Sequence, residues 1–212
     1  MTTAYVIKEI FKTLQGEGAQ TGRAAVFCRF AGCNLWSGRD QDRAAAACRF
    51  CDTDFVGDDG PGGGRFASAA ALAQAAATVW GPGAEHRLAV LTGGEPLLQV
   101  DAALIAALKA ERFQIALETN GSRLPPDGID WVCVSPKSTR DWALTWGDEL
   151  KLAYPQPELP PDGLERLRFN HFFLQPIDGS ERAANTAAAI RYCLDHPRWR
   201  LSLQTHKFTG MP

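Results

Sequence analysis

The sequence predicts an α/β protein built on an open, partial parallel β/α barrel of about six strands. Three observations support this prediction: apolar runs of strand length, helical segments between several of them, and a chain of 212 residues. Strands that alternate with helices favour a parallel sheet with right-handed crossovers. A closed barrel of eight units typically needs ~250 residues. We therefore expect too few strands to close the barrel.

The predicted strands are short apolar runs with little alternation, which is typical of strands covered on both faces. They span 24–31, 87–92, 114–118, 131–135, 150–153, 171–175 and 200–204. Helical patterns span 68–80, 101–112 and 180–195, the last two beginning with the capping residues Asp101 and Ser180. The stretch around 142–146 indicates an irregular connection, and the glycine-rich stretch 58–65 indicates a flexible loop.

Composition limits the partners and the compartment. The net charge of −2 gives no reason to expect nucleic acid or an anionic membrane surface as partner. No apolar run approaches the ~18 residues of a membrane-spanning helix. Residues 1–8 lack the basic start and apolar stretch of a secretory signal, so we expect a cytoplasmic protein. In a reducing compartment, six cysteines indicate metal binding or catalysis rather than disulfides.

Four of the six cysteines lie close together. Cys48 and Cys51 form a C-x2-C pair, and Cys33 precedes Cys48 by a gap of 14 residues. Four thiolates would close a structural zinc site, whereas three leave one metal position open for a substrate or cofactor. Cys28 is the candidate fourth ligand, but it lies inside an apolar strand. We therefore interpret Cys28 as a core residue and the other three as the ligands.

Further motifs follow the predicted strands and identify a family. TGGEP at 92–96 and ETNG at 118–121 each end a strand, and Phe50 directly precedes the last cysteine. With the cysteines, these motifs resemble the radical S-adenosylmethionine superfamily, whose usual spacing is C-x3-C-x2-C. The 14-residue gap departs from that spacing. Together with LQGEG at 14–18, Arg29, CDT at 51–53 and SPK at 135–137, it resembles the 7-carboxy-7-deazaguanine synthase family of queuosine biosynthesis.

The resemblance implies a fold, an activity and partners. It implies a single radical S-adenosylmethionine domain over residues 1–212, with an insertion for the cluster loop around 34–47. The activity implied is a lyase that converts 6-carboxy-5,6,7,8-tetrahydropterin to 7-carboxy-7-deazaguanine with loss of ammonia. A [4Fe–4S] cluster, S-adenosylmethionine and Mg²⁺ are the implied cofactors. A reductase such as flavodoxin would supply the electron, and the family implies a homodimer.

The resemblance also implies roles for individual residues, none of them a catalytic acid or base. The [4Fe–4S] ligands are Cys33, Cys48 and Cys51, and the Mg²⁺ ligand is Thr53, whose hydroxyl is a hard oxygen donor. The residues implied to bind S-adenosylmethionine are Phe50, Asp52, Gly94, Ser135, Lys137, Gln175 and Asp178. The residues implied to bind the substrate are Leu14, Gln15, Gly16, Arg29, Thr92 and Pro212.

Physical reasons support some of these roles. Arg29 offers a bidentate partner for the substrate carboxylate, and glycine at 94 permits close approach of a ligand to the backbone. The tail, residues 205–212, follows the last predicted strand, so we expect it to fold over the mouth of the barrel. In that interpretation Phe208 and Met211 pack, Gly210 turns, and Pro212 reaches the substrate.

The sequence also fits other roles for some of these residues and other functions for the whole chain. Lys137 also fits a solvated surface lysine, Thr53 an ordinary turn residue, and the TGGEP segment an ordinary turn between a strand and a helix. For the whole chain, one alternative is an activase that installs a glycyl radical on a partner protein. The other is a non-catalytic binding module held by zinc, which needs Cys28 as the fourth ligand.

Overall fold

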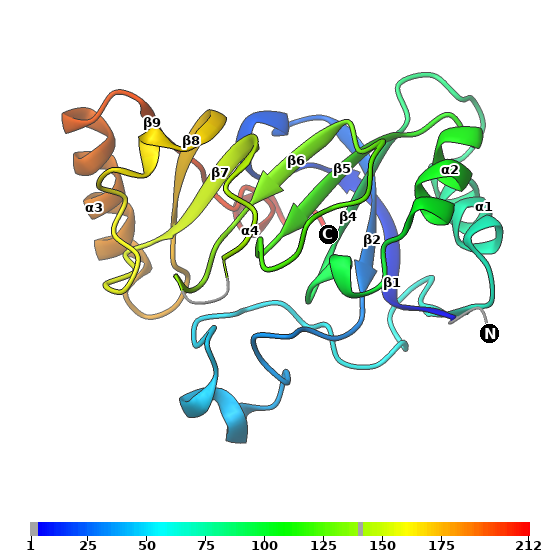
Figure 1. The fold of residues 1–212 in the computed structure, drawn as a ribbon, viewed down its shortest axis with the longest axis horizontal. Helices are drawn as coiled ribbons and strands as arrows, with labels where there is room; N and C mark the ends of the chain where they lie inside the picture. The colour runs from blue at the N-terminus through cyan, green and yellow to red at the C-terminus, as the bar shows by residue number, and fades with distance from the viewer. Residues whose placement is uncertain (1–3, 140–141) are drawn as a thin grey trace.

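The computed structural model describes residues 4–139 and 142–212. Residues 1–3 belong to the segment 1–8, which we expect not to be a secretory signal, and they lie outside the described residues. One nine-stranded sheet runs through these residues in the order β3-β1-β2-β4-β5-β6-β7-β8-β9 (Figure 1). The strands are β1 (Tyr5–Leu14), β2 (Ala24–Phe30), β3 (Gly64–Phe66), β4 (Leu88–Gly93), β5 (Gln114–Thr119), β6 (Trp131–Val134), β7 (Trp146–Tyr154), β8 (Arg168–Pro176) and β9 (Trp199–Leu201).

The open parallel sheet is confirmed, with two additional strands at one edge. β2 and β4 to β9 pair in parallel, whereas β1 pairs antiparallel with both β2 and β3. The sequence did not predict β1, because Lys8, Glu9 and Lys12 interrupt its apolar residues. A shift of register between Ile7 and Glu9 further breaks the alternation that marks a strand. Leu14, one of the predicted substrate-binding residues, consequently ends a strand.

The glycine-rich stretch 58–65 is a loop over residues 58–63, as predicted, whereas its last two residues belong to β3. The Ile10 amide donates to the Pro61 carbonyl at 2.8 Å, and the Gly60 amide donates to the Lys8 carbonyl at 2.9 Å. A Cβ atom at Gly63 would lie 2.2 Å from that same Lys8 carbonyl oxygen. Glycine is therefore required here for close packing against β1, and the stretch leads directly into β3.

Three of the helices lie where the sequence predicted them, one with a wrong cap, and the short helix at 206–209 was not predicted. The helices are α1 (Ala69–Trp80), α2 (Ala102–Ala110), α3 (Arg182–Asp195) and α4 (His206–Thr209), with 3-10 turns η1 (Gly18–Gln20), η2 (Asp40–Ala45), η3 (Pro96–Leu98) and η4 (Leu164–Arg166). Ser68 and Asp101 cap α1 and α2 through their side chains. Ser180 does not cap α3, which begins after Glu181 without a side-chain cap. No helix in the described ranges is long and apolar enough to cross a membrane.

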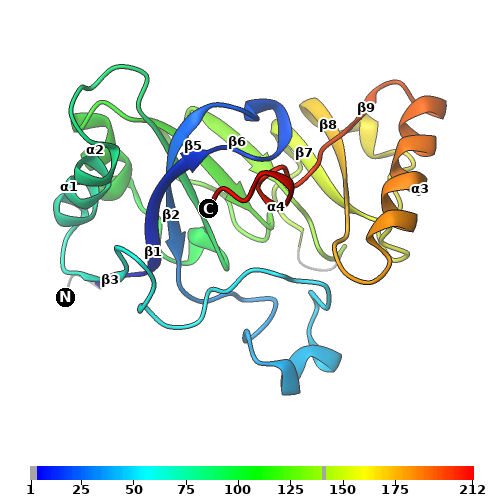
Figure 2. The same ribbon diagram turned by 180° about the vertical axis from the view of Figure 1, so that it is seen from behind.

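The two faces of the sheet differ in what covers them. α1, α2 and α3 pack on one face, where alternate strand residues such as Val26, Cys28 and Phe30 enter the main core. The intervening residues, among them Phe27 and Arg29, line a cavity on the other face. The short helix α4 and the C-terminus lie on this second face, in front of the strands in Figure 2. The sheet thus separates a stabilising core from an open face.

Candidate active site

All the residues that the sequence predicted for the site line one cavity of about 350 Å³. It lies where the parallel strands end, and the loop between β2 and β3 extends below that edge (Figure 1). Ligand pockets commonly have volumes of ~300–1,000 Å³. The predicted residues that line it are Leu14, Gln15, Gly16, Arg29, Cys33, Cys48, Phe50, Cys51, Asp52, Thr53, Thr92, Gly94, Ser135, Lys137, Gln175, Asp178 and Pro212.

Three cysteines face the cavity together. The thiol of Cys48 interacts with the sulfur of Cys51, and this bond lowers the pKa of Cys51 while it raises that of Cys48. The positive charge of Lys137 adds to the lowering of the Cys51 pKa and opposes the rise of the Cys48 pKa. Burial raises the pKa of Cys33, which lies across the loop from that pair. Because a metal binds the thiolate form, a depressed pKa at Cys51 suits a ligand.

Cys28 plays no part in this group. It is fully buried in β2, belongs to the main core, and is absent from the cavity lining. Burial alone raises its pKa to about 12, so the thiol stays protonated. The prediction of a core cysteine is confirmed. The zinc-held binding module is contradicted, because it requires Cys28 as the fourth ligand.

The donor set of three thiols matches the thiolate ligands that hold iron–sulfur clusters. Across residues 4–139 and 142–212, no three or more His, Cys, Asp or Glu side chains are gathered closely enough to hold one metal ion. In a [4Fe–4S] cluster each thiolate binds a different iron, so the sulfurs stand further apart than around one ion. Cys33, Cys48 and Cys51 line the same cavity, so as thiolates they could bind three irons of such a cluster.

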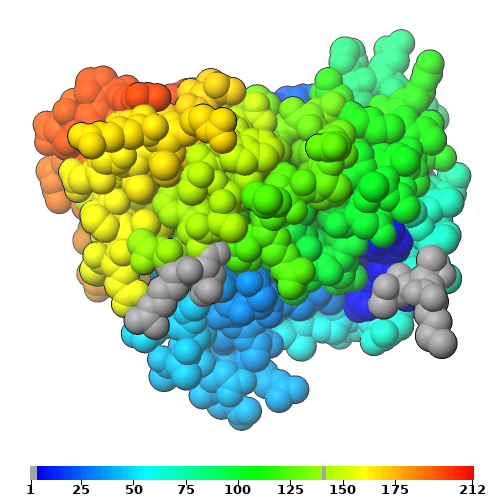
Figure 3. All heavy atoms as spheres, in the orientation of Figure 1, coloured from blue at the N-terminus to red at the C-terminus, as the bar shows by residue number. Residues whose placement is uncertain are grey.

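The loop that carries the cysteines has a small core of its own. Leu35 and Trp36 are buried, and the Trp36 ring meets Phe55 edge-on at 5.6 Å between centroids. The Leu35 carbonyl accepts from the amides of Ala47 and Cys48. Figure 3 shows this part of the chain projecting from the lower edge of the molecule. Its order therefore depends on contacts within the loop more than on the sheet.

The TGGEP segment is packed against the residues that precede Cys33. A Cβ atom at Gly94 would lie 2.0 Å from the Gly32 carbonyl oxygen, and the Glu95 amide donates to that oxygen at 2.9 Å. The need for glycine here therefore comes from the neighbouring backbone. The Glu95 carboxylate is fully buried and accepts from Thr119 Oγ1 and the Asn120 amide, both at 2.8 Å.

Through these contacts Glu95 connects two predicted motifs, TGGEP at 92–96 and ETNG at 118–121. Burial raises its pKa, although the donors from Asn120, Leu97 and Thr119 act in the opposite direction. Asn120 also donates to the Asn34 side chain at 3.1 Å, directly beside Cys33. The TGGEP turn, the end of β5 and the cysteine loop are thus held as one unit. This is more than an ordinary turn between a strand and a helix would require.

Lys137 is not a solvated surface lysine. It is half-buried, donates to Ser135 Oγ at 2.6 Å, and lies 5.7 Å from the centroid of the Phe50 ring. Its charge is close enough to influence the pKa of Cys48 and Cys51. The end of β6 therefore places a cation beside the cysteine pair.

Arg29 also lines the cavity, and its side chain is already oriented. Its Nε donates to Glu9 Oε1 at 2.7 Å, and its guanidinium lies 5.9 Å from the Phe11 ring centroid. Phe11 in turn stacks on Phe27 at 5.4 Å. An arginine held through Nε keeps its terminal nitrogens in a fixed plane, which is the geometry for a carboxylate.

A buried charge network that the sequence analysis missed forms the floor of the cavity. Lys151 Nζ pairs with Glu17 at 2.6 Å and with Glu118 at 3.3 Å, and Gln15 donates to the other Glu118 oxygen at 2.8 Å. Burial would lower the pKa of Lys151, but the two carboxylates outweigh it and raise the value. The same lysine lowers the pKa of Glu17 against the effect of burial. The available signal was a lysine in the middle of an apolar strand.

The tail folds onto the cavity as expected, with one difference. The Thr205 amide and hydroxyl both donate to the Gly16 carbonyl, and Thr13 Oγ1 donates to the Pro212 carbonyl at 3.1 Å. His206, which the sequence analysis left unassigned, also lines the cavity. Phe208 does not pack inward as predicted: its side chain is 63% exposed.

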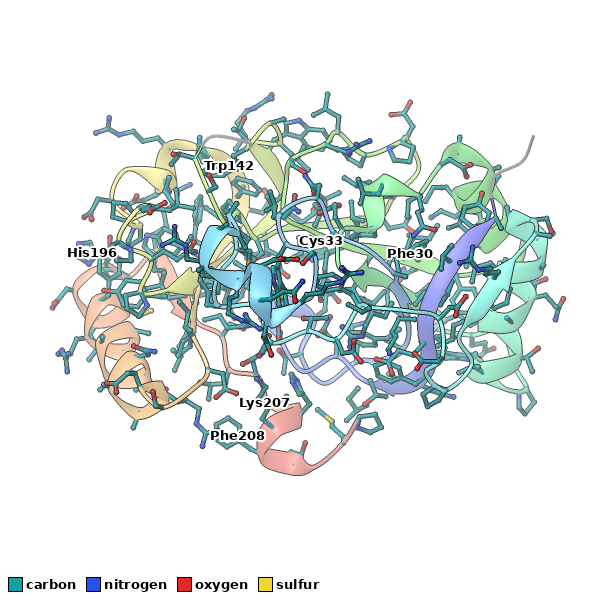
Figure 4. All side chains as sticks on the ribbon, turned by 90° about the horizontal axis from the view of Figure 1, so that it is seen from below. Phe30, Cys33, Trp142, His196, Lys207 and Phe208 are labelled. Carbon is teal, nitrogen blue, oxygen red and sulfur yellow. The ribbon has the colours of Figure 1, made fainter. Side chains whose placement is uncertain are left out.

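Lys207 fastens this tail to two other segments. It pairs with Asp178 at 2.7 Å and also with Asp52, which adjoins Cys51. The hydrogen bond from the Lys207 ammonium makes the largest contribution to the lowered pKa of Asp178. Figure 4 shows Cys33 in the middle of the molecule, with Lys207 and Phe208 on α4 at its margin.

The fold and the site define the class of protein. An open parallel α/β sheet, with a three-cysteine loop at the edge where its strands end, is the radical S-adenosylmethionine type of fold. The structure resembles the crystal structure of QueE from Escherichia coli with a TM-score of 0.66 and 25% identity, over 94% of this chain and 93% of that one. No protein-family model matches the chain.

Sequence comparison identifies the family within that class. The 7-carboxy-7-deazaguanine synthase of Bordetella pertussis is 63% identical over 99% of this chain and 100% of its own length. That of Caulobacter vibrioides is 60% identical over 98% and 99%. The chain belongs to the 7-carboxy-7-deazaguanine synthase family. It is an enzyme, a lyase of queuosine biosynthesis, and the activase alternative is not supported.

Proposed function

We propose that this enzyme converts 6-carboxy-5,6,7,8-tetrahydropterin to 7-carboxy-7-deazaguanine with loss of ammonia, using the cavity described above. The observation that carries the proposal is that three cysteines, a guanidinium and a buried carboxylate network meet in one cavity. The site therefore has a metal-binding wall and a polar wall that suits a charged heterocycle. The family assignment gives the reaction, and the cavity supports these roles for its residues.

Cys33, Cys48 and Cys51 would hold a [4Fe–4S] cluster with one iron open to the cavity. When bound, the cluster supplies the electron that cleaves S-adenosylmethionine to a 5′-deoxyadenosyl radical. Phe50, Ser135 and Lys137 line the wall beside the cysteines and would position the adenosyl portion. Further roles in binding S-adenosylmethionine are proposed for Asp52, Gly94, Gln175 and Asp178.

The substrate would lie against the opposite wall. Arg29, held by Glu9, would bind the substrate carboxylate through its terminal nitrogens. Glu118, held by Gln15 and Lys151, presents a carboxylate that would accept from the amino-pyrimidinone edge of the pterin. Thr53 would donate its hydroxyl oxygen to Mg²⁺, an ion that prefers oxygen ligands and keeps several waters. Leu14, Gly16, Thr92 and Pro212 complete the proposed substrate contacts.

The tail would keep water away from the reacting atoms. α4 and the residues after it cover part of the cavity on the face of the sheet that Figure 2 shows in front. Excluding water protects a radical from side reactions. We further propose a single domain over residues 1–212 with the cluster loop around 34–47 as an insertion, a homodimer, a cytoplasmic location, and a reductase such as flavodoxin as electron donor.

The test is anaerobic reconstitution with iron and sulfide, followed by an assay with the carboxytetrahydropterin. We expect visible absorbance, cleavage of S-adenosylmethionine after reduction, and formation of the deazaguanine product with release of ammonia. The Cys33→Ala variant, treated identically, should show none of the three. A reconstituted protein that cleaves S-adenosylmethionine but leaves the pterin unchanged would contradict the proposed substrate.

A further inference from the structure

The loop that carries the cysteines poses a positioning problem. With the usual three-residue spacer, the covalent chain itself keeps the first two cysteines close together. Here 14 residues separate Cys33 from Cys48, and a longer flexible loop holds its ends less firmly. The loop also projects from the molecule (Figure 3), so the sheet does not brace it along its length. Something within the loop must fix the second and third cysteines relative to the first.

One side chain of the insertion reaches the cysteine pair. Arg43 Nη1 donates to the backbone carbonyl of Arg49 at 3.1 Å and to that of Cys51 at 3.0 Å. The two carbonyls lie on either side of Phe50, within the turn that carries Cys48 and Cys51. A single guanidinium nitrogen therefore holds the backbone of the proposed ligand Cys51 and of Arg49, the residue that follows the proposed ligand Cys48.

Arg43 is itself held in place from two directions. Its guanidinium lies 4.0 Å from the centroid of the Trp36 ring, and Nε and Nη2 donate to Asp40 at 3.2 and 3.0 Å. Trp36 is 8% exposed and packs on Phe55, which is 1% exposed. Arg43 thus connects the anchored first half of the loop, which follows Cys33, to its second half.

We propose that Arg43 is the positioning residue of the metal centre: it fixes the Cys48–Cys51 turn relative to Cys33. This inference rests on the proposed [4Fe–4S] site. The arginine combines a planar face for Trp36 with a fork of donors for Asp40 and the two carbonyls. Lysine has a single rotatable ammonium and cannot reproduce that combination. Arg43 therefore does for the 14-residue gap what the short length does for a three-residue spacer: it keeps the cysteines in fixed relative positions.

Arg49 provides a matched control on the same loop. It is exposed, and its side chain makes a long bond of 3.4 Å to the Ala46 carbonyl. The test compares Arg43→Gln and Arg43→Lys with Arg49→Gln and Arg49→Lys, all prepared without metal and then reconstituted anaerobically. Circular dichroism of the metal-free forms reports folding. Iron release to a chelator and the electron paramagnetic resonance spectrum of the reduced cluster report the metal centre.

Loss of a group that orients metal ligands commonly weakens a site by about 10- to 100-fold. We expect Arg43→Gln to release iron faster by about that factor and to change the resonance line shape, with Arg43→Lys also impaired. The Arg49 variants should match the unaltered protein. If both Arg43 variants retain iron and spectrum as the Arg49 variants do, the positioning role is wrong.

The design separates this inference from the proposed function. If the unaltered protein takes up no cluster, the proposed function fails and Arg43 has no centre to position. If the unaltered protein takes up a cluster and the Arg43 variants are indistinguishable from it, the inference alone fails. Should Arg43→Gln not fold without metal, the comparison of Arg43→Lys with Arg49→Lys decides the question.

Discussion

The two walls of the cavity are built in different ways. The wall that would contact the substrate consists of strand residues such as Arg29, Glu118 and Lys151, held by the sheet and by one another. The wall with Cys33 and Cys48 belongs to a loop with a small core of its own. The whole fold positions one wall, whereas the other depends on local contacts and on the metal centre proposed for it.

This difference predicts how substitutions in each wall should affect stability and binding. Changes in the strand wall alter buried charges, so they should affect the free energy of unfolding as well as substrate binding. Changes in the loop wall should leave the sheet folded and remove the metal centre. Substitutions in the two walls should therefore have separable effects on stability and on the metal centre.

The largest expected effect concerns the cysteines. Changing Cys33, Cys48 or Cys51 to Ala should abolish the ~400 nm absorbance expected of thiolate-bound iron–sulfur, with the fold retained. Cys28→Ala is the control: it should keep the absorbance and lower the free energy of unfolding by about 1 kcal/mol, because it removes one buried heavy atom. Absorbance spectra and urea unfolding check both outcomes. Loss of the cluster in Cys28→Ala together with its retention in Cys33→Ala would overturn the ligand assignment.

Lys151→Met tests the strand wall. It would leave Glu17 and Glu118 buried without their cation, and breaking a buried pair in this way costs ~3–5 kcal/mol. The exposed pair of Lys109 with Asp130 provides a matched change, because Lys109→Met should cost only ~0–1 kcal/mol. Urea unfolding of both metal-free variants measures the difference. Equal losses of stability would show that the floor network does not hold this wall.

The same separation explains what could be predicted from the sequence. Strands β4 and β5 are buried on both faces, so their apolar runs mark them clearly. β1 escaped prediction because Lys8, Glu9 and Lys12 interrupt its apolar residues and because its register shifts. For the site, the motifs at strand ends located the cavity lining. The partners of Lys151 could not be inferred, since Glu17 and Glu118 reach it only when three distant segments fold together.

Arg43 illustrates the same limit on the loop side. The insertion contains several charged residues, and nothing in their spacing distinguishes Arg43 from Arg49. Only the folded loop places the Arg43 guanidinium between the Trp36 ring and the carbonyls near the cysteines. Sequence patterns record periodic burial and motifs, whereas a side chain that bonds to backbone oxygens leaves no pattern.

Arg29→Ala should weaken substrate binding with little effect on S-adenosylmethionine. Losing one partner of a buried charge pair costs ~2–5 kcal/mol, and Glu9 would also lose the cation to which it is bonded. Titration calorimetry with the reconstituted enzyme should therefore show strongly weakened binding of the carboxytetrahydropterin. If the affinities for both ligands fall by the same factor, the variant has a folding defect and the proposed role is wrong.

Thr53→Ala should have a smaller effect, because Mg²⁺ keeps several waters and one of them can replace a single neutral ligand. The Mg²⁺ concentration for half-maximal turnover should rise about tenfold, the low end for disturbed metal sites. Thr53→Ser keeps the hydroxyl and should behave as the unaltered enzyme does. Cleavage of S-adenosylmethionine should continue in both variants. An unchanged Mg²⁺ response in Thr53→Ala would rule out the role.

The smallest expected effect is at the tail, which belongs to neither wall but touches both. Thr205 fastens it to Gly16 on the strand side, and Lys207 fastens it to Asp52 beside the cysteine loop. Exposed ion pairs are each worth only ~0–1 kcal/mol. The Thr205 bonds should therefore keep the tail in place when its last residues are removed.

Deletion of Gly210–Pro212 should then raise the KM for the carboxytetrahydropterin about fivefold, equivalent to the ~1 kcal/mol of one hydrogen bond. The bond lost between the tail and β1 is the one from Thr13 Oγ1 to Pro212, whereas the Gly210 amide bond to His206 lies within the tail itself. A short polar tag after Pro212 should act in the same direction, because it places hydrated groups at the cavity. Absorbance of the cluster must be unchanged in both forms. If both forms turn over the pterin as the native chain does, the end of the tail is not part of the site, and the two walls alone define it.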